Sequence, residues 1–186
     1  MVYAPKIIQP LSEVSIEEAL RIQKRMQCVS LNRGDYILYD GEVCRRYYFV
    51  ESGTLRLFHR REEEEYTVWL GTSGEVFTNL ESYLDESPSR ISIQAIESTV
   101  VYTISKEQSD QLAHESNAYN TLLRKSVEKA FVGLSKNIMS YQSEPAHQRY
   151  NRLVEEKNWI TKYPLKYLSS FIGVTQSTLS RIRAKK

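Results

Sequence analysis

The segment from Gly173 to Lys186 carries side chains that could recognise double-stranded DNA. It reads GVTQSTLSRIRAKK and contains no acidic residue. An arginine can donate two hydrogen bonds to guanine, a glutamine can form two with adenine, and hydroxyl groups bond base edges or phosphates. The chemistry expected of this segment is therefore contact with a nucleic acid.

Position along the predicted helix separates two kinds of contact. The first two turns of a recognition helix usually enter the major groove, so polar residues there are the candidates for reading bases. These are Gln176, Ser177 and Arg181. Phosphate contacts set the register without reading sequence. The candidates for these contacts are Thr175, Thr178, Arg183, Lys185 and Lys186.

Two short helices within residues 165–182 are predicted to position these side chains. Gly173 supplies the turn, Thr175 can cap the second helix, and the small Ser169 lets the helices cross closely. The apolar residues expected between the helices are Leu165, Leu168, Ile172, Val174, Leu179 and Ile182. The pattern indicates a helix-turn-helix, although an ordinary amphipathic helical hairpin shares the apolar spacing.

Charge is distributed unevenly along the chain. Residues 1–144 carry 16 Lys and Arg against 21 Asp and Glu, whereas residues 145–186 carry 9 against 2. A basic segment on an acidic body is typical of a local nucleic-acid footprint, because phosphate contacts need cations on one face. The alternative is a solvated basic tail.

An apolar stripe precedes the basic segment and predicts one long helix of about 25 residues. Its members are spaced by three or four residues and are Leu123, Val127, Ala130, Leu134, Ile138 and Tyr141. The stripe has to be covered. From the residues alone, packing on the chain's own β unit and pairing with a second copy are equally good explanations.

Residues 29–105 predict a many-stranded β unit. Short runs such as RYYFVES, TLRLFHR and TVVYTIS are rich in β-branched and aromatic residues, and glycines separate several of them. The acidic run Glu62–Glu65 falls between two strands. Four adjacent carboxylates cannot converge on one ion, so we expect a solvated hairpin tip rather than a metal site.

Several classes of protein find no support in the sequence. It lacks H-E-x-x-H, G-x-S-x-G and P-loop motifs, so we expect no enzyme and no catalytic residue. Cys28 and Cys44 are too far apart to build a zinc site or an iron–sulfur cluster, and no metal is expected. No membrane span or signal peptide is evident, so a cytoplasmic protein without a membrane partner is expected.

The order of these parts resembles the Crp/Fnr family of bacterial transcription regulators. The resemblance rests on YYFVESGTLRLF, on GEVFTNLESYLDESPSRISIQAIESTVVYTIS and on FIGVTQSTLSRIR. It implies an α+β fold: an N-terminal double-stranded β-helix of the jelly-roll-like, cyclic-nucleotide-binding type, a long dimerisation helix and a C-terminal helix-turn-helix. The corresponding divisions are 1–115, 116–143 and 144–186.

The resemblance also implies partners. Family members are homodimers that bind palindromic operators in double-stranded DNA, and RNA polymerase is a further candidate partner. A dimer would cover the apolar stripe of the long helix. A twofold dimer places its two recognition helices about 34 Å apart, one turn of DNA.

The family's phosphate-binding cassette is degenerate here. It places Gly-Glu soon after a strand like GEVF and Arg-Ser or Arg-Thr about ten residues later. Aligned on GEVF, these positions hold Thr78, Asn79, Ser89 and Arg90. Arg90 comes one residue late, which reverses its face in an extended strand. We therefore predict no tight binding of cAMP or cGMP, and an unknown effector remains open.

The resemblance ends early at the C-terminus. Family members usually follow the recognition helix with a β-hairpin wing, whereas only residues 183–186 follow Ile182. The expectation is a short form lacking the wing. The alternative function is a ligand-binding or protein-interaction module that has this β fold but has lost sequence-specific DNA binding.

Overall fold

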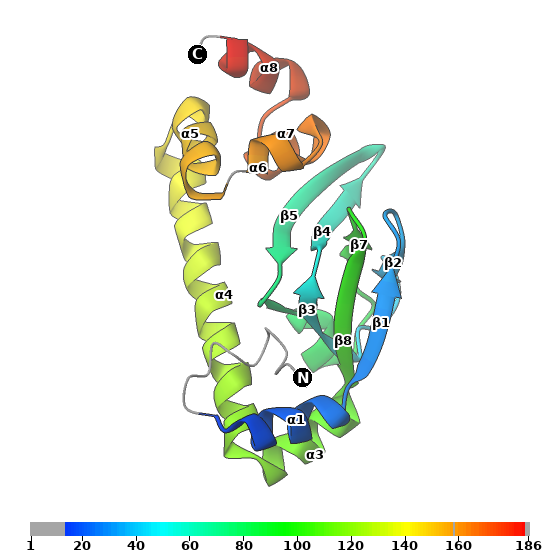
Figure 1. The fold of residues 1–186 in the computed structure, drawn as a ribbon. Helices are drawn as coiled ribbons and strands as arrows, with labels where there is room; N and C mark the ends of the chain where they lie inside the picture. The colour runs from blue at the N-terminus through cyan, green and yellow to red at the C-terminus, as the bar shows by residue number, and fades with distance from the viewer. Residues whose placement is uncertain (1–13, 158, 185–186) are drawn as a thin grey trace.

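The computed structural model describes residues 14–157 and 159–184 (Figure 1). A β unit lies beside one long helix, α4 (Asn117–Ser143), and shorter helices gather at the two ends of α4. Helices α1 (Ile16–Lys24) and α3 (Lys106–Glu115) lie where α4 begins, and α5–α8 lie where it ends. None of the helices in these residues is long and apolar enough to cross a membrane.

Within the described residues, the β unit consists of two antiparallel four-stranded sheets. The strand orders are β1-β8-β3-β6 and β2-β7-β4-β5. The strands are β1 (Gln27–Leu31), β2 (Tyr36–Leu38), β3 (Arg46–Ser52), β4 (Thr54–Arg61), β5 (Glu64–Thr72), β6 (Val76–Phe77), β7 (Ser92–Ala95) and β8 (Thr99–Ser105). The sequence pattern predicted a many-stranded β unit, and the two sheets have the jelly-roll-like, double-stranded β-helix architecture that the family resemblance implied.

The core of the β unit lies between the two sheets. Val50 of β3 and Val101 of β8, from one sheet, share a buried cluster with Leu55 of β4 and Ile93 and Ala95 of β7, from the other. β-branched and aromatic side chains suit these positions because they pack well on a pleated surface. The hydrophobic runs of the sequence therefore form the inner faces.

A second buried cluster joins the β unit to the helices at the start of α4. Ile22 of α1 packs with Phe49 and Ile104 of the first sheet and with Tyr119 and Leu122 of α4. The Ser15 hydroxyl caps α1 by accepting from the Glu18 amide at 3.2 Å. The first turns of α4 are thereby anchored to the β unit.

Farther along, α4 lies close to β5 at a glycine, Gly133. A Cβ atom added to Gly133 would lie 2.5 Å from the ring of Trp69 on β5, so a larger residue would push the helix away. The side of α4 that carries Gly133 thus faces the β unit.

The short helix α2 (Leu80–Asp85) lies on the chain between β6 and β7.

The C-terminal helices surround a third buried cluster. They are α5 (Ala146–Lys157), α6 (Trp159–Lys162), α7 (Leu165–Phe171) and α8 (Gln176–Ala184). Leu153, Trp159, Leu168 and Leu179 all contribute buried side chains to it. This cluster also includes Leu70 of β5, so the C-terminal helices pack on the β unit as well as on each other.

The acidic run lies at a hairpin turn, as expected, but one of its carboxylates is not solvated. Strands β4 and β5 pair up to Arg61 and Glu64, and Glu62 has a positive φ of 58° in the turn. Glu65 instead turns its side chain toward β4 and binds Arg56 at 2.8 Å. The expectation of a fully solvated tip was wrong for this residue.

Candidate nucleic-acid interface

The turn between α7 and α8 has the conformation of a helix-turn-helix. Gly173 has a φ of +70°, a region that glycine adopts without strain. The amide of Gly173 donates to Ser170 O at 3.2 Å, and that of Val174 donates to Ser169 O at 3.0 Å. These bonds end α7 and direct the chain into the next helix.

Buried side chains hold the two helices together at the predicted positions. Leu168 of α7 and Leu179 of α8 are almost inaccessible to solvent, and Ile172 is buried in the turn. Ser169 is also buried, and its hydroxyl donates to the Lys166 carbonyl at 3.1 Å. A small side chain whose hydroxyl bonds its own helix permits the close crossing expected from the sequence.

Thr175 caps α8 as predicted. Its hydroxyl oxygen accepts from the amide of Thr178 at 3.2 Å, and its carbonyl accepts from the amide of Leu179 at 3.0 Å. This side-chain bond satisfies one of the amides that have no partner within the first turn of a helix.

The predicted base-reading residues are brought together on the exposed surface of α8. Gln176, Ser177 and Arg181 are all exposed. Arg181 lies one turn after Ser177, and its Nε donates to the Ser177 carbonyl at 3.5 Å. Its side chain thus lies along α8 beside the first turn of the helix.

The predicted phosphate-binding residues are placed less uniformly. Thr175 and Arg183 are exposed, while Thr178 is half-buried and accepts a 3.4 Å bond from Arg181. Lys185 and Lys186 lie outside the described residues. Thr178 therefore supports Arg181 in this conformation.

The helix-turn-helix is docked on the β unit through α7. The amide of Thr67 on β5 donates to the Ser170 hydroxyl at 2.7 Å, and that hydroxyl donates to the Glu65 carbonyl at 2.9 Å. Just before α7, the Tyr163 hydroxyl lies 2.6 Å from the Thr54 hydroxyl on β4. The sequence offered no pattern that predicts this contact.

The centre of the docking contact is Arg56 on β4, whose side chain is fully buried. Its guanidinium lies between two rings, 4.2 Å from the centroid of Phe58 and 4.3 Å from that of Tyr167 on α7. Its Nε donates to Thr67 at 2.8 Å, and Nη1 pairs with Glu65 at 2.8 Å. These partners replace the water of Nε and Nη1, whereas Nη2 is buried without a hydrogen-bond partner among the described residues and faces only the rings.

Glu65 forms ion pairs with three basic side chains at this junction. Besides Arg56, it pairs with Arg60 at 3.0 Å and with Lys166 of α7 at 3.3 Å. Burial by itself would raise the pKa of Glu65, but the hydrogen bonds from Arg56, Arg60 and Lys166 outweigh it and lower the pKa to about 2. The carboxylate is therefore charged at neutral pH and joins α7 to the β hairpin.

Only part of the predicted stripe of α4 is exposed. Leu123 packs on the chain's own buried cluster and Ala130 is half-buried. Phe131, which is 71% exposed, was not among the predicted stripe residues. The exposed apolar residues at heptad spacing, called here the apolar seam, are Val127, Phe131, Leu134, Ile138 and Tyr141. Their alternating spacing of four and three residues was a signal that could have found Phe131.

The cassette residues are bonded to one another and to the backbone. The Asn79 side-chain amide donates to the buried Ser89 hydroxyl at 2.7 Å, and Ser89 donates to the Ile91 carbonyl. The Thr78 hydroxyl donates to the Arg46 carbonyl at 2.9 Å. Arg90, in contrast, is exposed and pairs with Glu81 at 3.0 Å. Of the four positions, only Asn79 and Ser89 bond each other, while Thr78 bonds the backbone of β3 and Arg90 pairs with Glu81 at the surface.

The described residues contain no group of three or more His, Cys, Asp or Glu side chains that could hold a metal ion. Residues 28–116 match the family model of the cyclic nucleotide-binding domain. Among curated proteins, none matches the chain. Sequence similarity therefore reaches the β unit, and the other parts of the chain are compared through their fold.

Three solved structures are similar to the chain over most of its length. A CooA mutant from Carboxydothermus hydrogenoformans is 16% identical with a TM-score of 0.74, over 100% of this chain and 85% of that one. The c-di-GMP-responsive global regulator CLP from Xanthomonas campestris is 12% identical with a TM-score of 0.73, over 92% and 91%. The catabolite activator protein of Thermus thermophilus is 22% identical with a TM-score of 0.58, over 93% and 84%.

Proposed function

We propose that this chain, which has the fold of the Crp/Fnr regulators and a cyclic nucleotide-binding domain over residues 28–116, is a homodimeric DNA-binding transcription regulator and not an enzyme. The observation that carries the proposal is the exposed surface of α8. There Gln176, Ser177 and Arg181 project from a helix whose other face is buried. Such a helix can enter the major groove without unfolding the domain that holds it.

In this proposal the chain has three functional parts, residues 1–115, 116–143 and 144–186. The first is a sensor-like β unit, the second pairs with a second copy, and the third binds DNA. Support for pairing comes from the apolar seam, since five large apolar side chains at heptad spacing are more than a solvated helix normally exposes.

The β unit is proposed to respond to no cyclic nucleotide. Tight binding of a cyclic phosphate requires a charge-assisted contact, usually from an arginine. Ser89 uses its hydroxyl on Asn79 and on the backbone, and Arg90 pairs with Glu81 at the surface. Neither Ser89 nor Arg90 therefore places a positive charge where it could bind a phosphate at the cassette.

Fluorescence anisotropy with a random-sequence duplex at about 50 and about 200 mM salt tests DNA binding. For about five phosphate contacts, the affinity should fall about 10²- to 10³-fold between the two conditions. A Lys125→Ala variant serves as the control, because Lys125 is exposed on α4 away from α8. Absence of binding even at low salt would reject the proposal in favour of an interaction module.

A further inference from the structure

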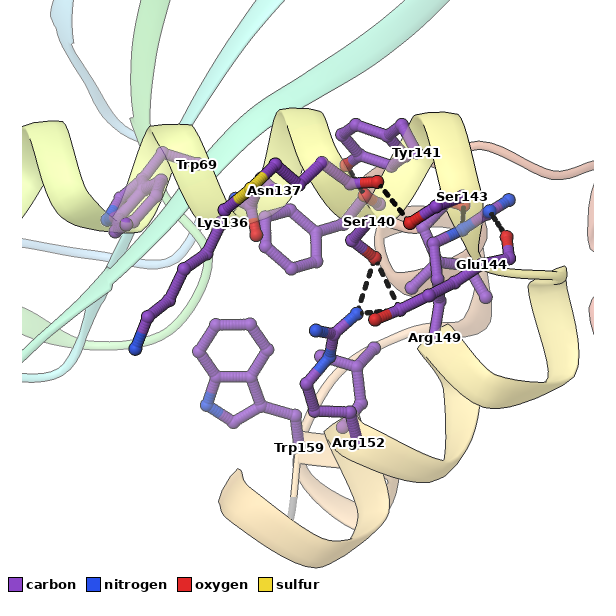
Figure 2. Close-up of a pocket in the computed structure, with 15 residues that line it drawn as sticks. Trp69, Lys136, Asn137, Ser140, Tyr141, Ser143, Glu144, Arg149, Arg152 and Trp159 are labelled. Carbon is purple, nitrogen blue, oxygen red and sulfur yellow. Dashed lines mark hydrogen bonds and ion pairs between the residues drawn. The ribbon is translucent and has the colours of Figure 1, made fainter.

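A cavity of about 490 Å³ lies where the C-terminal part of α4 meets α5, α6 and α7 (Figure 2). Its lining comes from separate parts of the chain, including Trp69 of β5, Lys136 of α4, Arg152 of α5 and Trp159 of α6. Its size is in the range of natural small-molecule sites. It is distinct from the cassette, since none of the four cassette positions lines it.

The apolar part of the lining is aromatic. Trp69 and Trp159 are the two tryptophans of the whole sequence, and both line the cavity together with Phe171. Trp159 is held edge-on to Phe171, with their ring centroids 5.4 Å apart. Rings held in this way offer a preformed surface for a flat apolar group.

The polar part of the lining has an excess of positive charge. Lys136, Arg149 and Arg152 line the cavity, against one carboxylate, Glu144. Arg152 pairs with Glu144 and also donates to Ser140. Arg149 donates to backbone carbonyls, which do not neutralise its charge. Among the side chains of residues 14–155 and 162–184, no carboxylate forms an ion pair with Lys136 or Arg149, so these side chains favour an anion.

We propose that this cavity binds a small organic anion that carries a flat aromatic ring. The ring lies against the indoles, and the acidic group faces the cations of α4 and α5. Figure 2 shows Lys136, Trp159 and Arg152 arranged around the same open space. The ligand would contact the β unit, the long helix and the helices that lead into the helix-turn-helix at once.

Four of the five seam residues lie outside the lining of this cavity, and only Tyr141 belongs to both. Lys136 precedes Ile138 by two residues, which places the two side chains about 160° apart around the helix axis. Pairing of two α4 helices through the seam therefore covers the side of α4 away from Lys136. The cavity and the proposed dimer can exist together, and binding to the cavity does not depend on DNA binding.

Two probes test the proposal. 8-Anilinonaphthalene-1-sulfonate has a flat aromatic ring system and a sulfonate, and N-phenyl-1-naphthylamine has the same rings without the charge. Because both tryptophans line the site, fluorescence excited at 295 nm reports occupancy directly. We expect one molecule of the sulfonate per chain, quenching of tryptophan emission, and binding of the neutral probe at least about fivefold weaker, as expected for one partly exposed ion pair.

Matched variants locate the bound probe. Lys136→Met should weaken the sulfonate about fivefold and leave the neutral probe unchanged, whereas Lys125→Met should change neither. Phe131→Ser, on the apolar seam, should also change neither. Equal binding of the two probes, no quenching, or loss of binding in Phe131→Ser with retention in Lys136→Met would overturn the proposal.

Discussion

The guanidinium of Arg56, on β4, lies 4.3 Å from the ring centroid of Tyr167, on the first helix of the helix-turn-helix. These residues are 111 positions apart in the chain, and their contact joins the β unit to the DNA-binding candidate. Arg56 is fully buried there and also binds Glu65 and Thr67. The orientation of α8 thus depends on a contact between two distant segments.

Removal of the Tyr167 ring should loosen this docking. A desolvated cation–π contact contributes about 2 kcal/mol, so Tyr167→Ala should lower the free energy of unfolding by about that amount in urea titrations. Tyr66→Ala removes an exposed ring from the same hairpin and is the control. Equal effects of the two variants would contradict a specific role for Tyr167.

The docking should weaken in acid because of Glu65. Its pKa is about 2 in the folded chain against an ordinary value of 4.5. A lowered pKa adds stability above pH 4.5, and this contribution is lost as the pH falls from about 4.5 to about 2. Urea unfolding across this range should therefore show a smaller pH dependence in Glu65→Gln than in the parent chain.

The matched control for the acid dependence is Glu63→Gln. Glu63 is exposed at the turn of the same hairpin. Its substitution should leave the pH dependence of unfolding between 4.5 and 2 unchanged. If Glu63→Gln and Glu65→Gln flattened the curve equally, the effect would belong to the net charge of the hairpin and not to the Arg56 contact.

A single charge on the apolar seam should separate the dimer. Phe131→Glu would place like charges at the centre of a helix pair, and analytical ultracentrifugation should then find a monomer at micromolar concentration. Val132→Glu is the control, because Val132 is also exposed but lies about 100° around the helix axis from Phe131. A dimer that survives Phe131→Glu would exclude the seam as the interface.

Cyclic nucleotides should bind weakly or not at all. Isothermal titration with cAMP and with cGMP is expected to give no affinity in the micromolar range, because the hydroxyl of Ser89 is already used and Arg90 faces solvent. Micromolar or tighter binding of either nucleotide would show that another group supplies the cation for the phosphate.

Substitutions on α8 should separate base reading from phosphate binding. Arg181→Ala should relax the preference at one position of a selected site, at a cost of about 1–3 kcal/mol for the preferred base. Arg183→Ala should instead weaken all sequences alike and reduce the salt dependence. Selection of bound duplexes from a random pool measures both. Identical profiles would contradict the assigned roles.

Several elements follow directly from local sequence. The turn at Gly173, the cap at Thr175 and the buried Leu168 and Leu179 of the helix-turn-helix agree with the prediction, because short-range spacing and turn chemistry decide them. The β unit was predictable for the same reason. The stripe of α4 was predicted less well, since Leu123 faces the chain's own core and Phe131 faces outward.

What the sequence determined by itself is therefore the set of elements and the chemistry of α8. Only the tertiary structure decided how these elements meet. The buried Arg56, the lowered pKa of Glu65 and the cavity between Trp69 and Trp159 all depend on residues brought together from distant segments. Local periodicity carries no information about such pairs, because burial and charge pairing are fixed by packing between elements and not by spacing within one.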